Sequence, residues 1–158
     1  MIRVLVVDDS ATAREAITMM LRSTPDIEVI GEASDGAEGV ELAARLKPDV
    51  ITMDINMPRV NGHEATRRIM STIPTPIVVV TTVSRQEMIR QGLDILLVGA
   101  LEIVQKPSAL TVKGFEAIQS ELIAKVREVA QIKFTPPGGS SKIGGLAESS
   151  GNDSDVVR

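Results

Sequence analysis

The sequence predicts an α/β fold with a doubly wound, five-stranded parallel sheet covered by helices on both faces. Short runs rich in Val and Ile alternate with stretches whose apolar residues recur at helical spacing. The runs lie at residues 2–7, 27–33, 50–53, 76–80 and 101–104. Consecutive apolar positions are typical of strands buried on both faces. Strand–helix alternation repeated five times therefore predicts parallel strands joined by right-handed crossovers.

Helical spacing and terminal signals define the intervening helices. Apolar stripes predict a helix after each of the first three strands, through Ala13, Ile17, Met20 and Leu21, then Val40, Leu42, Ala43 and Leu46, and then Ala65, Ile69 and Ile73. The terminal signals are Asp35-Gly36 and Lys47-Pro48 around the second helix, and Asn61 and Pro74 around the third. Ser84 and Glu87 form a capping box that opens a fourth helix. A fifth helix is predicted over residues 112–131.

The composition of the 158 residues excludes several classes of protein. A net charge of −4 and only two aromatic residues, Phe115 and Phe134, argue against a nucleic-acid-binding surface. The absence of cysteine excludes disulfides, thiolate metal sites and a cysteine nucleophile, and it suits a cytoplasmic protein. The longest apolar stretch, residues 93–104, contains two acidic residues and is too short to span a bilayer, so no membrane insertion is expected.

The composition changes after Phe134. Residues 135–158 contain ten Gly or Ser among 24 and show no sustained hydrophobic period. Such a segment is typical of a flexible linker. We therefore expect one domain over residues 1–134 and a linker over residues 135–158, with a downstream output domain absent from the chain.

Acidic, hydroxyl-bearing and basic residues follow four of the predicted strands. Asp8-Asp9 follows the first strand, Asp54 the third, Thr81-Thr82 the fourth and Lys106 the fifth. The carboxyl ends of parallel strands meet at one edge of a sheet, where the ligands of open α/β sheets bind. We therefore expect three carboxylates, a hydroxyl and an amine to converge there.

This cluster predicts a site for Mg²⁺ and a phosphoryl group. Neighbouring carboxylates stay ionised at neutral pH only when a cation lies among them, and all-oxygen ligands favour Mg²⁺. With Lys106 beside it, such a site suits phosphoryl transfer, which depends on positioning and electrostatics. Asp54 ends its strand at this site, so it can attack phosphorus and form an aspartyl phosphate. Pro58 fixes φ in the following loop, and Gly62 is expected to relax the turn into the next helix.

Four motifs in this order resemble the receiver domain of two-component response regulators: VLVVDDS at residues 4–10, DINMPRVNG at 54–62, VVVTT at 78–82 and QKPS at 105–108. The resemblance covers residues 1 to about 130. It implies a flavodoxin-like or CheY-like receiver fold with the strand order 2-1-3-4-5. It also implies that a sensor histidine kinase of the CheA kind donates the phosphoryl group.

The resemblance gives each residue at the strand ends a role. It implies Asp54 as the phosphoacceptor, Thr81 as the switch hydroxyl and Lys106 as the lysine that pairs with the phosphoryl group. The implied Mg²⁺ ligands are the side chains of Asp9 and Asp54, the backbone carbonyl of Asn56 and, through water, Asp8.

Ile103 departs from the family pattern, which usually has a tyrosine or phenylalanine three residues before the lysine as a rotamer switch. The output coupling of this chain is therefore expected to differ. The bond between Lys106 and Pro107 is typically cis in the family, and the same is expected here.

Within that family the chain is most similar to the regulatory half of chemotaxis protein-glutamate methylesterases of the CheB type. The supporting stretches are MDINMPRVNGHEATRRIM, PTPIVVVTT and GALEIVQKPS. Those proteins place a linker after the receiver and then a serine-hydrolase domain that demethylates receptor glutamates, whereas this chain has no G-x-S-x-G motif. The resemblance implies a fragment or truncated regulator that gates a missing esterase domain, with chemoreceptors as further partners.

Two other functions remain open on the sequence. A stand-alone receiver could act purely by protein binding. A Mg²⁺-dependent phosphohydrolase of the haloacid dehalogenase type also forms an aspartyl phosphate, but it places a second Asp two residues after the nucleophile, where this chain has Asn56. A dinucleotide-binding fold is excluded, because DDSAT follows the first strand in place of G-x-G-x-x-G.

Overall fold

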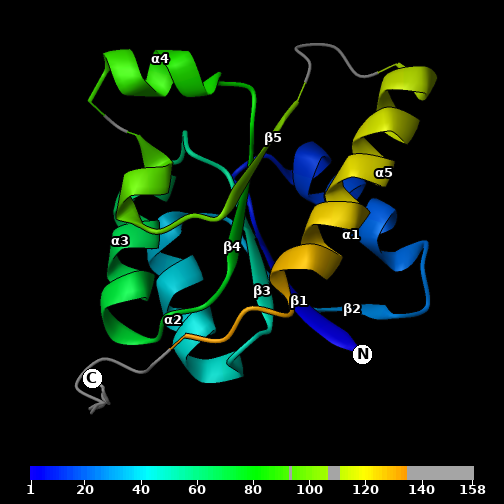
Figure 1. The fold of residues 1–158 in the computed structure, drawn as a ribbon, viewed down its shortest axis with the longest axis horizontal. Helices are drawn as coiled ribbons and strands as arrows, with labels where there is room; N and C mark the ends of the chain where they lie inside the picture. The colour runs from blue at the N-terminus through cyan, green and yellow to red at the C-terminus, as the bar shows by residue number, and fades with distance from the viewer. Residues whose placement is uncertain (93, 107–110, 135–158) are drawn as a thin grey trace, which may run out of the picture.

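The computed structural model describes residues 1–92, 94–106 and 111–134. Five parallel strands form its sheet in the order β2-β1-β3-β4-β5 (Figure 1). The strands are β1 (Ile2–Val7), β2 (Ile27–Ala33), β3 (Val50–Met53), β4 (Ile77–Thr81) and β5 (Glu102–Gln105). The predicted fold class and strand order are therefore confirmed.

Helices cover both faces of this sheet (Figure 1). They are α1 (Ala11–Arg22), α2 (Gly36–Leu46), α3 (Gly62–Thr72), α4 (Arg85–Arg90) and α5 (Val112–Val129), with a 3-10 helix η1 (Ile95–Val98) before β5. Buried residues of α1 and α5 pack against one face, and those of α2, α3, α4 and η1 pack on the other side.

The core consists of two apolar clusters, one on each face of the sheet. Successive strand residues point to opposite faces, so Val50 joins the cluster under α1 and α5 while Ile51 joins the cluster under α2 and α3. All four residues of β3 are buried, which explains why three of them are apolar. Asp54 directly follows this doubly covered central strand.

Hydrogen bonds confirm the predicted helix N-caps. Asp35, Asn61 and Ser84 each accept a bond from the backbone N–H three residues later, at 2.8, 2.9 and 3.1 Å. These bonds satisfy N–H groups that have no partner within the helix. The capping box at Ser84 forms in this direction only, since the described bonds of the Glu87 carboxylate come from Arg90 and Gln91.

Several element boundaries differ from the prediction. β4 and β5 each begin and end one residue later than predicted, and α5 ends at Val129. The helix α4 contains only six residues. The apolar stretch after it forms η1, which no periodic pattern indicated; Asp94 caps it by accepting a bond from Leu96 N–H at 3.3 Å.

Two expectations fall outside the described ranges. They are the linker over residues 135–158 and the cis bond between Lys106 and Pro107. A search of the helices in the described ranges finds none with the length and hydropathy needed to cross a membrane.

Candidate functional site

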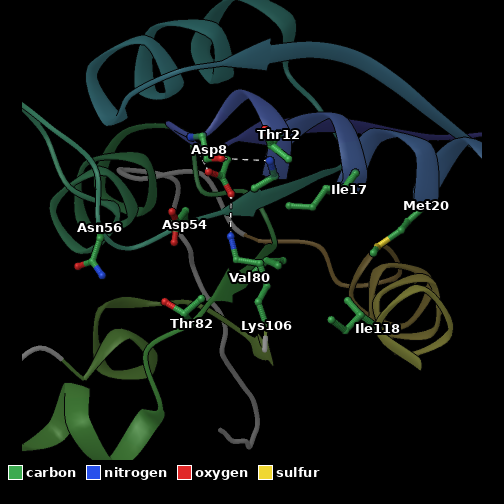
Figure 2. A pocket seen from close by; sticks show the side chains of 13 residues that line it. Asp8, Thr12, Ile17, Met20, Asp54, Asn56, Val80, Thr82, Lys106 and Ile118 are labelled. Carbon is green, nitrogen blue, oxygen red and sulfur yellow. Dashed lines mark hydrogen bonds and ion pairs between the residues drawn. The ribbon is translucent and has the colours of Figure 1, made fainter. Parts of the chain in front are cut away.

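The ends of the strands bring the predicted site residues to one edge of the sheet (Figure 2). Backbone bonds continue the ladder beyond the strands. Asp54 N–H donates to the Val7 carbonyl at 3.0 Å, and Lys106 N–H donates to the Thr81 carbonyl at 2.7 Å. Each bond ties the end of one strand to that of its neighbour, so the sheet fixes where these side chains leave the backbone.

Three carboxylates meet at this edge. Asp8, Asp9 and Asp54 each place a carboxylate oxygen within 4.8 Å of the other two. Asp8 is fully buried and Asp54 is 9% exposed, whereas Asp9 is open to solvent. The structure therefore brings together the three acidic residues that the sequence singled out.

Lys106 balances part of this negative charge. Its Nζ lies 3.0 Å from Asp8 Oδ2, although the two residues are 98 positions apart (Figure 2). The other carboxylate oxygen of Asp8 accepts a bond from Ser10 N–H at 2.9 Å. Both oxygens of Asp8 therefore have protein partners, and one ammonium group cannot balance three carboxylates.

Burial raises the pKa of Asp54 above its ordinary value of 3.8, and the charge of Asp8 raises it further. Lys106, the Ile55 N–H and the Thr81 hydroxyl act in the opposite direction without reversing the shift. The Ile55 N–H donates to Asp54 Oδ1 at 2.8 Å. The ionised form of Asp54 is therefore held in unfavourable surroundings, which a bound cation would relieve.

A cavity of about 350 Å³ opens in front of these groups. Its polar part is lined by Asp8, Asp54, Asn56, Thr82 and Lys106. The cavity continues between α1 and α5 along an apolar wall formed by Ala13, Ala16, Ile17, Met20, Val80 and Ile118 (Figure 2). The polar part therefore combines two carboxylates with one ammonium group. This combination suits a metal cation and a phosphoryl group bound side by side.

The two threonines at the end of β4 have different surroundings. Thr81 is fully buried, and its hydroxyl accepts a bond from Val83 N–H at 3.3 Å. Thr82 is exposed and lines the cavity. The sequence pointed to both hydroxyls, but it did not assign a role to Thr82, whose outward direction follows from strand alternation.

Gly62 is required for a reason other than the predicted one. Among the described residues, positive φ values occur at Lys47, Arg59, Gly92 and Gly99, so Gly62 does not supply a left-handed turn. A Cβ at Gly62 would instead lie 1.9 Å from the Asp54 carbonyl oxygen. The missing side chain therefore lets α3 approach the backbone of Asp54. The expectation that Gly62 relaxes the turn is wrong. Glycine is required at this position because a side chain would collide with the backbone of Asp54.

Ile103 is half-buried and packs against the apolar cluster under α2 and α3. Its backbone carbonyl accepts a bond from Lys125 Nζ of α5 at 2.8 Å. Side chain and backbone are thus tied to different layers of the domain. The backbone carbonyl of Ile103 therefore connects β5 to α5 through the Lys125 side chain.

The donor set of the cavity fits a hard divalent cation. Asp8, Asp9 and Asp54 offer only carboxylate oxygens, and Asn56 lines the cavity together with Asp8 and Asp54. Oxygen ligands of this kind suit Mg²⁺. Burial first, and the charge of Asp8 second, raise the pKa of Asp54, and a bound cation would favour its ionised form against both.

Comparison with protein families and curated proteins gives consistent matches. The model of the response regulator receiver domain family matches residues 4–113. A protein-glutamate methylesterase/protein-glutamine glutaminase of Myxococcus xanthus is 45% identical over 132 residues, which cover 84% of this chain and 37% of that protein. A protein of the same name from Pyrococcus abyssi is 40% identical, with 83% and 35% covered. The chain therefore spans little more than a third of the length of these relatives.

Solved structures agree with these matches. The response regulator domain of Thermotoga maritima CheB superposes with a TM-score of 0.76 and 41% identity, covering 84% of this chain and 98% of that one. The receiver domain of AraT, a response regulator from Geobacillus stearothermophilus, superposes with a TM-score of 0.65 and 27% identity, covering 80% and 93%.

Proposed function

The chain belongs to the response regulator receiver domain family, in the form found in CheB-type proteins, and we propose that it is a switch whose Asp54 accepts a phosphoryl group. One observation carries the proposal. Asp54 follows the buried central strand with its carboxylate among those of Asp8 and Asp9, and it shares a cavity with Lys106. The family match favours this switch over the phosphohydrolase hypothesis.

The proposed reaction is a displacement at phosphorus. A carboxylate oxygen of Asp54 attacks, a P–O bond forms, and the bond from phosphorus to the donor atom breaks, so that the donor leaves with the electron pair. Because Asp54 Oδ1 accepts a bond from Ile55 N–H, Oδ2 is the proposed attacking oxygen. The rigid strand β3 holds the Asp54 carboxylate in a fixed direction, which lowers the entropic cost of reaching the reactive geometry.

A bound Mg²⁺ would offset the negative charge of the phosphoryl oxygens. The side chains of Asp9 and Asp54 and the backbone carbonyl of Asn56 would hold it directly, and Asp8 would act through water. Two contacts of Asp8, from Ser10 N–H and Lys106 Nζ, support this indirect role, because they already engage both of its oxygens. The exposed carboxylate of Asp9 supports a direct one.

Lys106 and Thr81 are the proposed partners of the phosphoryl oxygens. The ion pair with Asp8 keeps the Lys106 ammonium at the cavity until a phosphoryl group competes for it. The Thr81 hydroxyl accepts a bond from Val83 N–H, and its rotation toward the phosphoryl group would release that N–H. The loop that precedes α4 would then sense the modification.

The proposed donor is a sensor histidine kinase of the CheA kind. The proposed output is control of a protein-glutamate methylesterase domain, the activity named for the longer Myxococcus and Pyrococcus relatives. Chemoreceptors are then the proposed substrates of that domain.

Phosphorylation of Asp54 is tested by intact-mass measurement after incubation with acetyl phosphate. The wild type is expected to gain one phosphoryl group with Mg²⁺ and none with a chelator, and Asp54→Asn is expected to gain none. Asp49→Asn is the matched control, since Asp49 precedes the same strand at its opposite end. Equal labelling of Asp54→Asn and the wild type would show that the acceptor is another residue.

A further inference from the structure

We propose that Arg14 of α1 is a positioning residue that holds the backbone of the Asp8–Asp9 pair in the orientation that cation binding requires. The inference rests on the proposed function, because the cation is the one assigned to that site. Arg14 does not line the cavity, and its contact with the Asp8–Asp9 pair is to the backbone.

Arg14 connects the first acidic loop to the edge of the sheet. Its Nη1 donates to the backbone carbonyl of Asp8 at 2.7 Å, and its Nε lies 3.2 Å from Glu32 Oε1. The Arg14 side chain is 20% exposed and that of Glu32 41%, so the bond to the Asp8 carbonyl is partly shielded from water while the ion pair is exposed. A planar guanidinium can donate in two fixed directions at once, and here one direction serves β2 and the other serves the loop after β1.

An irregularity in β2 places Glu32 where Arg14 can reach it. Val4 pairs with Val29, but Leu5 pairs with Gly31, so the register between β1 and β2 slips by one residue. A slip of one residue exchanges the faces of all later side chains. Glu32 consequently pairs with Val6, whose side chain belongs to the cluster under α1 and α5.

The far end of Glu32 is also held. The hydroxyl of Thr18, one turn along α1 from Arg14, donates to Glu32 Oε2 at 3.4 Å, and Thr18 is 5% exposed. Arg14 therefore rests on a carboxylate anchored by the same helix. Because Glu32 holds its guanidinium, Arg14 can fix the position of the Asp8 carbonyl to which it donates.

The Asp8 carbonyl influences the orientation of Asp9. The Asp8 carbonyl and the Asp9 N–H belong to one planar peptide unit, so fixing the carbonyl fixes the direction in which Asp9 leaves the loop. The described hydrogen bonds and ion pairs of the chain include none to the Asp9 carboxylate, which is exposed. Its place among the three carboxylates thus depends on its backbone.

Charge and geometry make opposite predictions for Arg14. A cation beside an acidic site repels Mg²⁺, so a purely electrostatic role predicts tighter Mg²⁺ binding when Arg14 is replaced by alanine, and little change on replacement by lysine. A positioning role predicts weaker Mg²⁺ binding for both Arg14→Ala and Arg14→Lys. Lysine keeps the positive charge but lacks the planar guanidinium that donates in two fixed directions. The sign of the change therefore separates the two roles.

The test is Mg²⁺ titration of the full chain, followed by amide NMR shifts. Arg14→Ala is expected to weaken Mg²⁺ binding about 10-fold, the usual scale for residues that orient a ligand, and Arg14→Lys is expected to weaken it by a smaller factor. Arg22→Ala is the matched control, because it removes the same charge from an exposed position in the last turn of α1. Its Mg²⁺ affinity is expected to equal that of the wild type or exceed it.

Amide hydrogen exchange without metal gives a second readout. Arg14→Ala is expected to accelerate exchange at Asp9 and Ser10, and Arg22→Ala is not. Unchanged or tighter Mg²⁺ binding by Arg14→Ala, beside normal binding by the wild type, would overturn the inference alone. A wild type that does not bind Mg²⁺ would overturn the proposed function, and the inference with it.

Discussion

The carboxylate of Asp54 works against the stability of the domain that carries it. It is 9% exposed, it lies beside Asp8, and its pKa is raised by burial first and by that neighbouring charge second. A folded-state pKa above the unfolded value means that the native state keeps the proton to higher pH. The contribution of Asp54 to the free energy of unfolding therefore falls as the pH rises through the raised pKa.

Asp54→Asn is expected to stabilise the metal-free domain by about 1 kcal/mol at neutral pH, the usual size of a stabilising substitution. Asparagine keeps an oxygen for the Ile55 N–H but has no charge to bury. The gain in unfolding free energy should shrink as the pH falls toward 3.8, the ordinary value of the group. Urea denaturation across this range measures it. A gain that stays constant with pH would exclude the charge as its source.

Gly62→Ala is expected to lower the free energy of unfolding by about 2–3 kcal/mol, because overpacking forces backbone to move. The added Cβ would meet the Asp54 carbonyl oxygen at 1.9 Å. Gly114→Ala in α5 is the control, since its Cβ would meet only the Thr111 hydroxyl, at 3.1 Å. Thermal and urea unfolding of both variants provide the comparison. Equal stability of the two would contradict the close approach of α3 to Asp54.

Among the elements, sequence reasoning located those with strong local signals. β1, β2 and β3 begin and end where the predicted runs do, because each run is rich in Val and Ile and is followed by a polar residue. Asp35, Asn61 and Ser84 mark helix starts because a cap is a contact within four residues. The convergence of Asp8, Asp9 and Asp54 followed from parallel strands sharing one edge.

Contacts between distant segments could not be predicted in this way. The ion pair of Lys106 with Asp8, the register slip beside Gly31 and the space at Gly62 all depend on two elements meeting in three dimensions. η1 was missed because four apolar residues in a 3-10 turn have no period to detect. Tertiary packing, and not propensity, determines these features.

The link between β4 and α4 is expected to transmit the signal. Thr81→Ala should largely abolish the amide NMR response of residues 81–85 to a phosphoryl mimic, because the hydroxyl that now holds the Val83 N–H is gone. Ile103→Val should preserve that response, since the half-buried, β-branched Ile103 has a restricted χ1 and cannot move between solvent and interior as an aromatic ring does. If Ile103→Val loses the response and Thr81→Ala keeps it, the signal does not pass through Thr81.

At the scale of the whole molecule, the sheet and its two apolar clusters account for the described core. Every buried apolar side chain of that core lies between Val4 and Val129. Each cluster contacts the sheet and at least two helices, so the domain is closed on both faces.

Removal of residues 135–158 is therefore expected to leave the thermal midpoint within about 2 °C of that of the full chain, since no buried apolar area of the described core is lost. Differential scanning calorimetry of the two forms measures the difference. Truncation after residue 117 is the contrasting form, because it removes Leu122 and Val126 from the core, and it should not fold. A large drop on removing residues 135–158 would place the domain boundary later in the chain.

The separation of 98 positions between Lys106 and Asp8 has a consequence during protein synthesis. A ribosome releases the chain from its N-terminus, so Asp8 and Asp54 emerge well before the ammonium that pairs with Asp8. Until β5 joins β4, the acidic groups have neither their lysine nor a finished sheet edge. Under the proposed function, a chain whose synthesis has not yet reached β5 is expected to be a poor substrate for the kinase. The complete set of site residues is therefore expected only after synthesis has passed β5, the last strand in the described part of the chain.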